Sequence, residues 1–170
     1  MASVCFYFQA HQPPRLRRYS VFDAEPTYFD DSRNAEICRK VVAKCYQPIT
    51  ELLLQLIQAN GGRFRVSFSL TGTLLEQLQQ YSPETIDRFR RLAQTGCCEF
   101  LAETYYHSLA SIYSRDEFVY QLDLHAQITE ELFNQKPVVF RNTELIYNNE
   151  LAAFVAGLER YSGILAEGVD

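Results

Sequence analysis

The sequence lacks the features by which membrane-spanning and nucleic-acid-binding proteins are usually identified. No apolar run approaches the length needed to cross a bilayer, and the formal net charge is −5. Only Arg15, Arg17 and Arg18 form a short basic cluster, which we interpret as part of a solvated loop with local ion pairs. We therefore expect neither nucleic acid nor a membrane among the partners.

The sequence also lacks a cysteine pattern typical of metal or disulfide sites. Its five cysteines are odd in number and fit no zinc-ligand spacing. Cys97 and Cys98 are adjacent, so they would point to opposite sides of a strand. We interpret all five as buried thiols in a reducing compartment. No basic-then-apolar leader opens the chain, and the prediction is a cytoplasmic protein.

No internal repeat, low-complexity segment or linker divides the 170 residues. The hydrophobic content of 47% and the charged content of 22% are ordinary for a folded domain. Tryptophan is absent, although the chain has 11 tyrosines and 12 phenylalanines. Any stacking of a sugar on an aromatic ring must then use other residues, such as Tyr105, Tyr106 and Tyr147.

Short apolar runs alternate with amphipathic patterns along the whole chain. The predicted strands are residues 3–9, 65–70, 97–102, 138–140 and 163–166. Apolar residues at every position from 4 to 8 indicate a first strand covered on both faces. A long excursion from Arg15 to Asp31 follows it, on the side of the sheet where we expect a site.

Helices are predicted between these strands. Asp31 and Ser32 are candidate caps for a helix that starts near Asn34, and Pro48 begins a second one that ends at residues 60–62. Further helices follow residues 71–73 and start at residues 82–84 and 114–117, the last with a capping-box pattern. Another covers residues 150–158.

Strict alternation of strand and helix predicts an α/β fold with parallel strands and right-handed crossovers. Five such units are too few to close an eight-stranded barrel. The last predicted strand, residues 163–166, has no helix after it and would leave an apolar edge. We therefore interpret residues 1–170 as the front part of a barrel that belongs to a larger protein.

Three of the predicted strands end in polar residues. Because the carboxyl ends of parallel strands share one edge, and α/β proteins build their sites there, we expect the polar side chains to converge. The candidates are His11, Gln12, Glu103, His107, Asn142 and Glu144. This convergence is the main argument from the residues for an enzyme.

Each candidate also has a structural interpretation. Glu144 suits a nucleophile or general base, but it could equally cap the next helix or pair with Arg141. Glu103 suits a second carboxylate or a group that binds hydroxyls. His11, His107 and Glu103 together could hold a metal ion, although no His-x-His or His-Glu-x-x-His spacing supports it. His125 is expected to be a surface or packing residue.

Three segments together resemble family 57 of the glycoside hydrolases, the α-amylase and 4-α-glucanotransferase group. They are His11-Gln12-Pro13, the run from Glu99 to Leu109, and the run from Phe140 to Leu145. The resemblance covers essentially the whole chain in the right order. It implies a retaining hydrolase or transferase on an incomplete seven-stranded (β/α) barrel, acting on an α-glucan or maltooligosaccharide without a metal or organic cofactor.

The resemblance also implies roles for the candidate residues. The family's nucleophile falls on Glu144, and its substrate-binding His-Gln pair falls on His11 and Gln12. Glu103 and His107 match a motif that lines the same cleft, and we expect Asn142 to contact substrate with them. The family's acid/base is an aspartate in a later motif, which we expect beyond residue 170.

Two other functions stay open on the sequence alone. A metal-dependent polysaccharide deacetylase can share an irregular (β/α) barrel and would use His11, Glu103 and His107 around a divalent ion. A catalytically silent carbohydrate-binding module would need no second carboxylate.

Overall fold

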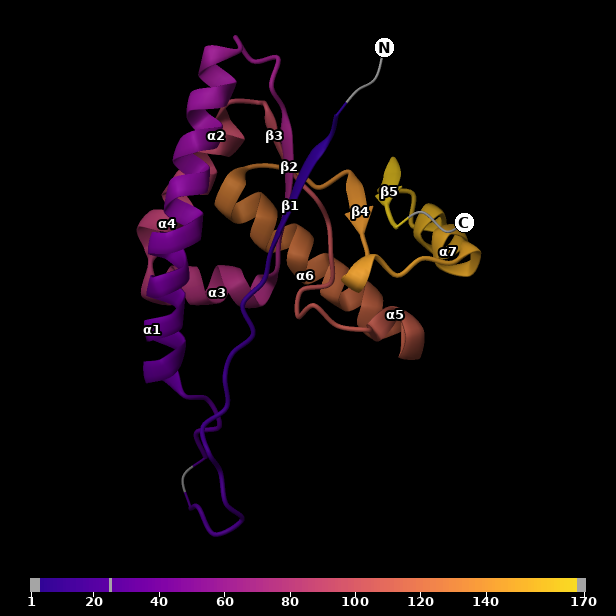
Figure 1. The fold of residues 1–170 in the computed structure, drawn as a ribbon. Helices are drawn as coiled ribbons and strands as arrows, with labels where there is room; N and C mark the ends of the chain where they lie inside the picture. Colours follow the sequence, from indigo (N-terminus) through magenta and orange to yellow (C-terminus); the bar gives the residue numbers. More distant parts are fainter. Residues whose placement is uncertain (1–3, 25, 168–170) are drawn as a thin grey trace.

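The protein is described by a computed structural model that covers residues 4–24 and 26–167. Strands and helices alternate along the chain, as Figure 1 shows. In order, the elements are β1 (Phe6–Ala10), α1 (Asp31–Val41), a π-helix (Val42–Tyr46), α2 (Gln47–Ala59), β2 (Val66–Leu70), α3 (Gly72–Tyr81), α4 (Pro83–Gln94), β3 (Cys98–Phe100), α5 (Ala110–Tyr113), α6 (Arg115–Phe133), β4 (Val139–Arg141), a 3-10 turn (Thr143–Leu145), α7 (Asn149–Gly157) and β5 (Gly163–Leu165).

The strand pairings confirm the predicted parallel α/β fold. β1, β2 and β3 form one parallel sheet in that order, and β4 pairs in parallel with β5. A parallel bridge between Ala102 and Phe140 connects the two sheets, with the Ala102 amide 2.8 Å from the Val139 carbonyl oxygen. The carboxyl ends of β1 to β4 therefore lie along one edge.

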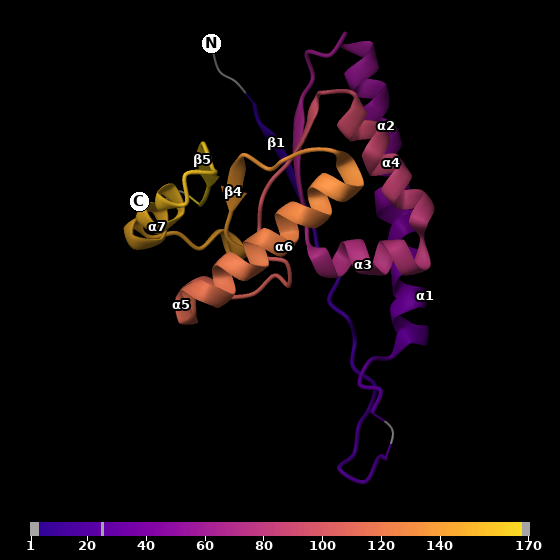
Figure 2. The ribbon, with the colours of Figure 1, turned by 180° about the vertical axis from the view of Figure 1, so that it is seen from behind.

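The helices gather on one face of the strands. Figure 1 shows no helix in front of β1 and β2, whereas the view from behind in Figure 2 shows α6 lying across the strands. Between the strands and helices, Phe68, Phe89, Phe100 and Phe133 stack into the main core. A smaller core around Phe118 and residues 102, 122, 140, 151 and 155 supports β4 and α7.

The expectation that β1 is covered on both faces is wrong. Phe8 packs into the core, but Phe6 and Gln9 are exposed or nearly so, and Val4 lies outside the strand. Because side chains alternate along a strand, Tyr7 and Gln9 point to the helix-free face. There the Tyr7 hydroxyl lies 2.6 Å from the Ser69 hydroxyl of β2. One face of this largely apolar strand therefore carries side chains that form hydrogen bonds.

Several predicted boundaries also shift. The first helix starts at Asp31, and its cap is Asp30, whose carboxylate accepts a hydrogen bond from the Arg33 amide at 2.9 Å. The two helices expected on either side of residue 47 are continuous through the π-helix. This wider turn ends at Tyr46, two residues before Pro48. Pro48 has no amide hydrogen, so it cannot donate the bond to the Lys44 carbonyl that a regular α-helix would have.

The cysteine prediction holds in part. Cys38, Cys97 and Cys98 are buried free thiols, as expected, whereas Cys5 and Cys45 are exposed. None of the described helices combines the length with the apolar character that crossing a bilayer requires.

Candidate active site at the carboxyl edge of the sheet

His107 and Glu144 form the centre of the candidate site. The His107 Nε2 atom lies 2.8 Å from Oε1 of Glu144, although the two residues come from different loops, after β3 and after β4. Both residues have a φ of 55°, in the left-handed region that side chains other than glycine rarely adopt. Strained backbone of this kind is concentrated at functional sites.

A buried ion pair lies beneath this hydrogen bond. Glu103 and Arg141 are almost completely buried, and Nη1 of Arg141 lies 3.6 Å from Oε2 of Glu103. The same Glu103 oxygen is 3.7 Å from Nδ1 of His107. Neither carboxylate oxygen of Glu103 accepts a hydrogen bond within the described part of the chain. A buried carboxylate is costly without partners, and the Arg141 guanidinium and the His107 ring beside it offset this cost.

Gln9, at the end of β1, connects these groups. Its Oε1 atom accepts a hydrogen bond of 2.7 Å from Nη2 of Arg141, and its Nε2 atom lies 3.5 Å from Nδ1 of His107. The strand that was predicted from the apolar run at positions 4–8 therefore contributes, through Gln9 just after that run, a positioning side chain to the site.

His11 completes the group from the other side. Its ring stacks on the His107 ring, with centroids 4.3 Å apart and planes at 26°. Its Nδ1 atom lies 2.9 Å from the hydroxyl of Thr71 and 3.4 Å from that of Thr73, which follow β2. The hydroxyls fix one ring nitrogen, so the other ring nitrogen is the one left for a ligand.

The surroundings set distinct charge states for these residues. The Glu103 carboxylate, assisted by Glu144, raises the pKa of His107 above its ordinary value despite partial burial of the ring. The hydrogen bond from His107 lowers the pKa of Glu144. Burial, followed by the neighbouring His107, lowers the pKa of His11. At neutral pH the site holds an ionised Glu144 and a neutral His11.

The structure brings together four of the six predicted site residues: His11, Glu103, His107 and Glu144. Arg141 does not bond to Glu144, the structural alternative in the sequence analysis, but pairs with Glu103. The Glu144 side chain is 69% exposed and free to meet a substrate.

The remaining two predicted residues, Gln12 and Asn142, use their polar groups within the protein. The Gln12 side chain accepts a hydrogen bond from Arg15 at 3.0 Å. Asn142 is buried and donates to the Ile146 carbonyl at 3.0 Å and to the Ser111 hydroxyl at 3.3 Å. The Asn142 contacts connect the segment that follows Glu144 to helix α5, so Asn142 supports the backbone around Glu144.

The sequence analysis missed Gln9, Thr71, Thr73 and Arg141. The two threonines could have been found, because they directly follow a predicted strand, as the other candidates do. Arg141 and Gln9 carried a similar signal, since Arg141 directly follows the predicted strand 138–140 and Gln9 directly follows the apolar run 4–8. Their roles, however, depend on contacts with another strand that the sequence does not show. Tyr105, a candidate for stacking, is instead buried, with its hydroxyl bonded to Glu76 at 2.8 Å.

The arrangement does not fit a metal centre. Among residues 4–24 and 26–167, no group of three His, Cys, Asp or Glu side chains is placed to hold a metal ion. His107 directs Nε2 at Glu144, and His11 directs Nδ1 at Thr71, so these nitrogens face partners within the protein. What the site offers is an exposed, ionised carboxylate above buried hydrogen-bonding groups.

Comparisons with known proteins agree with this chemistry. Residues 5–170 match the family described as glycosyl hydrolase family 57. The chain is 39% identical, over 171 residues, to a Methanocaldococcus jannaschii protein named "Putative alpha-amylase". That match covers 98% of this chain and 36% of the relative, so the chain spans about a third of the relative's length.

Two solved structures share the fold. The 4-alpha-glucanotransferase from Thermococcus litoralis superposes with a TM-score of 0.73 and 16% identity, over 96% of this chain and 22% of that one. The alpha-amylase AmyC from Thermotoga maritima gives a TM-score of 0.67 and 13% identity, over 98% and 40%.

Proposed function

Because this chain belongs to glycosyl hydrolase family 57, we propose that it carries the nucleophile of an active site that cleaves or transfers α-glucosidic bonds with retention of configuration. The substrate is an α-glucan or a maltooligosaccharide. Residues 1–170 form the N-terminal part of the catalytic barrel, in a cytoplasmic enzyme that uses no metal or organic cofactor.

The observation that carries this proposal is the bond between Glu144 and His107. It engages one carboxylate oxygen, Oε1, and keeps the group ionised. Oε2 is the oxygen that would attack the anomeric carbon. The bond from that carbon to the leaving oxygen breaks as a glycosyl ester forms on Glu144, and a water or a sugar hydroxyl then displaces the ester.

A retaining mechanism needs a second carboxyl group about 5 to 5.5 Å from the nucleophile. It protonates the leaving oxygen in the first step and removes a proton from the attacking hydroxyl in the second. Glu103 is a poor choice, because it is buried and paired with Arg141. We assign this role to an aspartate beyond residue 170. We assign to His11 the binding of substrate hydroxyls, and to the buried Glu103 the positioning of His107 and Arg141.

Glu144→Gln in the complete protein tests the nucleophile. The neutral amide cannot form the glycosyl ester, so kcat/KM on maltooligosaccharides should fall about 10⁴-fold, which corresponds to roughly 5.4 kcal/mol of barrier. Glu130→Gln, which changes an exposed glutamate of α6, is the matched control and should retain full activity.

Covalent trapping identifies the residue directly. A fluorinated glucosyl fluoride should add one glycosyl unit to the peptide that contains Glu144, as read by mass spectrometry. A label on another carboxylate would refute the assignment of the nucleophile. Binding of maltooligosaccharides without turnover by the wild-type protein would instead indicate a silent binding module, and a stoichiometric bound transition metal would favour the deacetylase alternative.

A further inference from the structure

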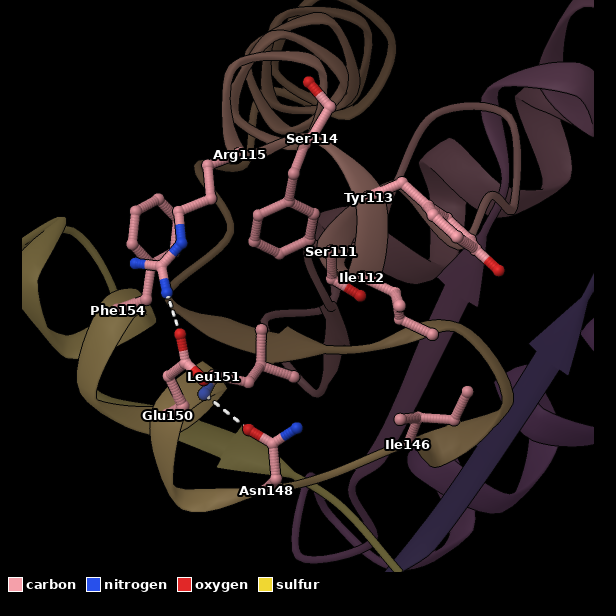
Figure 3. A pocket seen from close by; sticks show the side chains of 11 residues that line it. Ser111, Ile112, Tyr113, Ser114, Arg115, Ile146, Asn148, Glu150, Leu151 and Phe154 are labelled. Carbon is pink, nitrogen blue, oxygen red and sulfur yellow. Dashed lines mark hydrogen bonds and ion pairs between the residues drawn. The ribbon is translucent and has the colours of Figure 1, made fainter.

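A separate pocket of about 370 Å³ lies beside the candidate site, between the start of α6 and the segment that leads into α7 (Figure 3). Its apolar part is formed by Phe118, Leu151 and Phe154, and its polar part by Arg115, Asn148 and Glu150. This volume is in the range of small-molecule sites, roughly 300 to 1,000 Å³. None of these six residues belongs to the cluster around Glu144.

The pocket and the nucleophile share one segment of chain. Ile146 lines the pocket and lies two residues after Glu144. Asn142 holds this segment in place, because its amide donates to the Ile146 carbonyl and also to the hydroxyl of Ser111, on the opposite wall. The pocket is therefore fixed relative to Glu144 and lies on the same edge of the sheet.

The lining selects a neutral ligand that has both apolar faces and hydroxyls. Arg115 forms an ion pair with Glu150, and its guanidinium carbon lies 4.6 Å from the centre of the Phe154 ring. Arg115 and Glu150 are the charged residues of the lining, and they neutralise each other. The pocket therefore favours neither an anionic nor a cationic ligand. An aromatic ring edged by hydrogen-bonding groups is the usual environment of a sugar ring. Phe118 is fully buried and Arg115 covers one face of Phe154, so Tyr113, which is 83% exposed, is the aromatic side chain of the lining that is most open to a ligand.

We infer that this pocket is a binding subsite for a part of an α-glucan chain remote from the bond that reacts. The inference rests on the proposed function, and it predicts that the enzyme favours long substrates over short ones. The rival occupant is a further segment of the same polypeptide, which would fill the pocket permanently and leave no room for sugar.

The test uses Tyr113→Ala combined with Arg115→Ala in the complete protein. Both side chains are exposed, so the fold should survive. We expect kcat/KM for maltoheptaose to fall about tenfold relative to kcat/KM for glucosyl fluoride, which is too short to reach the pocket. Tyr120→Ala, which removes an exposed tyrosine of α6 outside the pocket, should change neither value.

Binding provides a readout that does not depend on turnover. Calorimetry on Glu144→Gln protein should show weaker binding of maltoheptaose when Tyr113→Ala and Arg115→Ala are added. Equal effects on long and short substrates, or unchanged binding, would overturn the subsite. The subsite would also be overturned if the double substitution lowered the melting temperature but left the ratio of kcat/KM for maltoheptaose to kcat/KM for glucosyl fluoride unchanged. That result would indicate that a segment of the polypeptide fills the pocket. If the proposed function itself were wrong, the wild-type protein would not turn over glucosyl fluoride, so the two failures can be distinguished.

Discussion

His107 is the residue on which the geometry of the candidate site depends. Its ring lies between the carboxylates of Glu103 and Glu144 and stacks on His11. The backbones of His107 and Glu144 both adopt the left-handed conformation, with φ of 55°. Each of these strained backbone conformations lowers the stability of the folded state. The hydrogen bond between the two side chains partly offsets this cost.

The titration of His107 tests this arrangement. Its pKa should lie above the ordinary 6.5, since the charged form is held by two carboxylates. Glu144→Gln removes one of these charges, so the pKa should fall, whereas Glu130→Gln should leave it unchanged. The measurement is ¹³C NMR of labelled histidine in the complete protein, with the signal assigned by His107→Gln.

The direction of the pH effect follows from the same shift. A histidine whose pKa is raised by folding stabilises the folded state fully below the unfolded value, and this contribution is lost as the pH rises through the folded value. Replacing His107 by Gln should therefore reduce stability more at pH 6 than at pH 9. A larger loss at pH 9 would contradict an ionised His107.

At the scale of elements, local sequence signals predicted the ends of the strands better than they predicted which side chains of a strand lie on which face of the sheet. The predicted cap at Ser114 is confirmed by a hydrogen bond from the Glu117 amide to the Ser114 hydroxyl. The reciprocal bond of a capping box is replaced, because the Ser114 amide donates to the Ala110 carbonyl and the Glu117 carboxylate accepts from Gln121. The ends of β1, β3 and β4 carry most of the predicted site residues, because the run of apolar residues stops where the sheet stops. These signals are local, so they can be read without knowing the fold.

What could not be predicted depends on contacts between distant segments. Arg141 belongs to β4, and its buried side chain pairs with Glu103, in the segment after β3, and with Gln9 of β1. The same holds for Tyr7, whose polar partner is on β2. In both cases the sequence shows a polar or aromatic residue beside an apolar run, and only the register of neighbouring strands decides which face it takes.

Gly72 provides a test of packing at the start of α3. A Cβ atom at this position would lie 2.4 Å from the ring of Tyr105, which is buried and held by Glu76. Gly72→Ala should therefore lower the free energy of unfolding by about 1 to 3 kcal/mol. At Gly157, the last residue of α7, an added Cβ meets no atom within 4 Å, so Gly157→Ala is the matched control.

The measurement is urea unfolding of both variants beside the wild type. The control should be neutral or slightly stabilising, since alanine favours a helix more than glycine does. An equal effect of the two substitutions would show that Tyr105 moves aside without cost.

At the scale of the whole molecule, the distribution of polar groups indicates which face is the inside of the barrel. Helices cover one face of the strands, and the opposite face carries Tyr7, Gln9 and Ser69. In a closed barrel this face would be the interior, and these polar groups would lie beneath the active site. Buried polar groups need partners, which explains why Gln9 and Arg141 bond to each other there.

Residues 1–170 expressed alone should self-associate. Among the described strands, β1 pairs with β2 alone, and Phe6 is 46% exposed. An uncovered strand edge with apolar side chains pairs readily with another chain. Light scattering coupled to size-exclusion chromatography should show mass that increases with concentration, and Phe6→Lys should reduce this increase. A concentration-independent monomer with a cooperative melt would contradict the prediction.

The same 170 residues alone also test where the second catalytic carboxyl group lies. Glu144 and its support from His107, Glu103 and Arg141 are all present, so the nucleophile should be intact while protonation of the leaving oxygen fails. We expect almost no hydrolysis of natural maltooligosaccharides, whereas glucosyl fluoride, whose leaving group needs no proton, should retain measurable turnover that Glu144→Gln abolishes. Clear hydrolysis of maltooligosaccharides would place the acid/base within residues 1–170, because a glucan's leaving oxygen departs slowly without a proton.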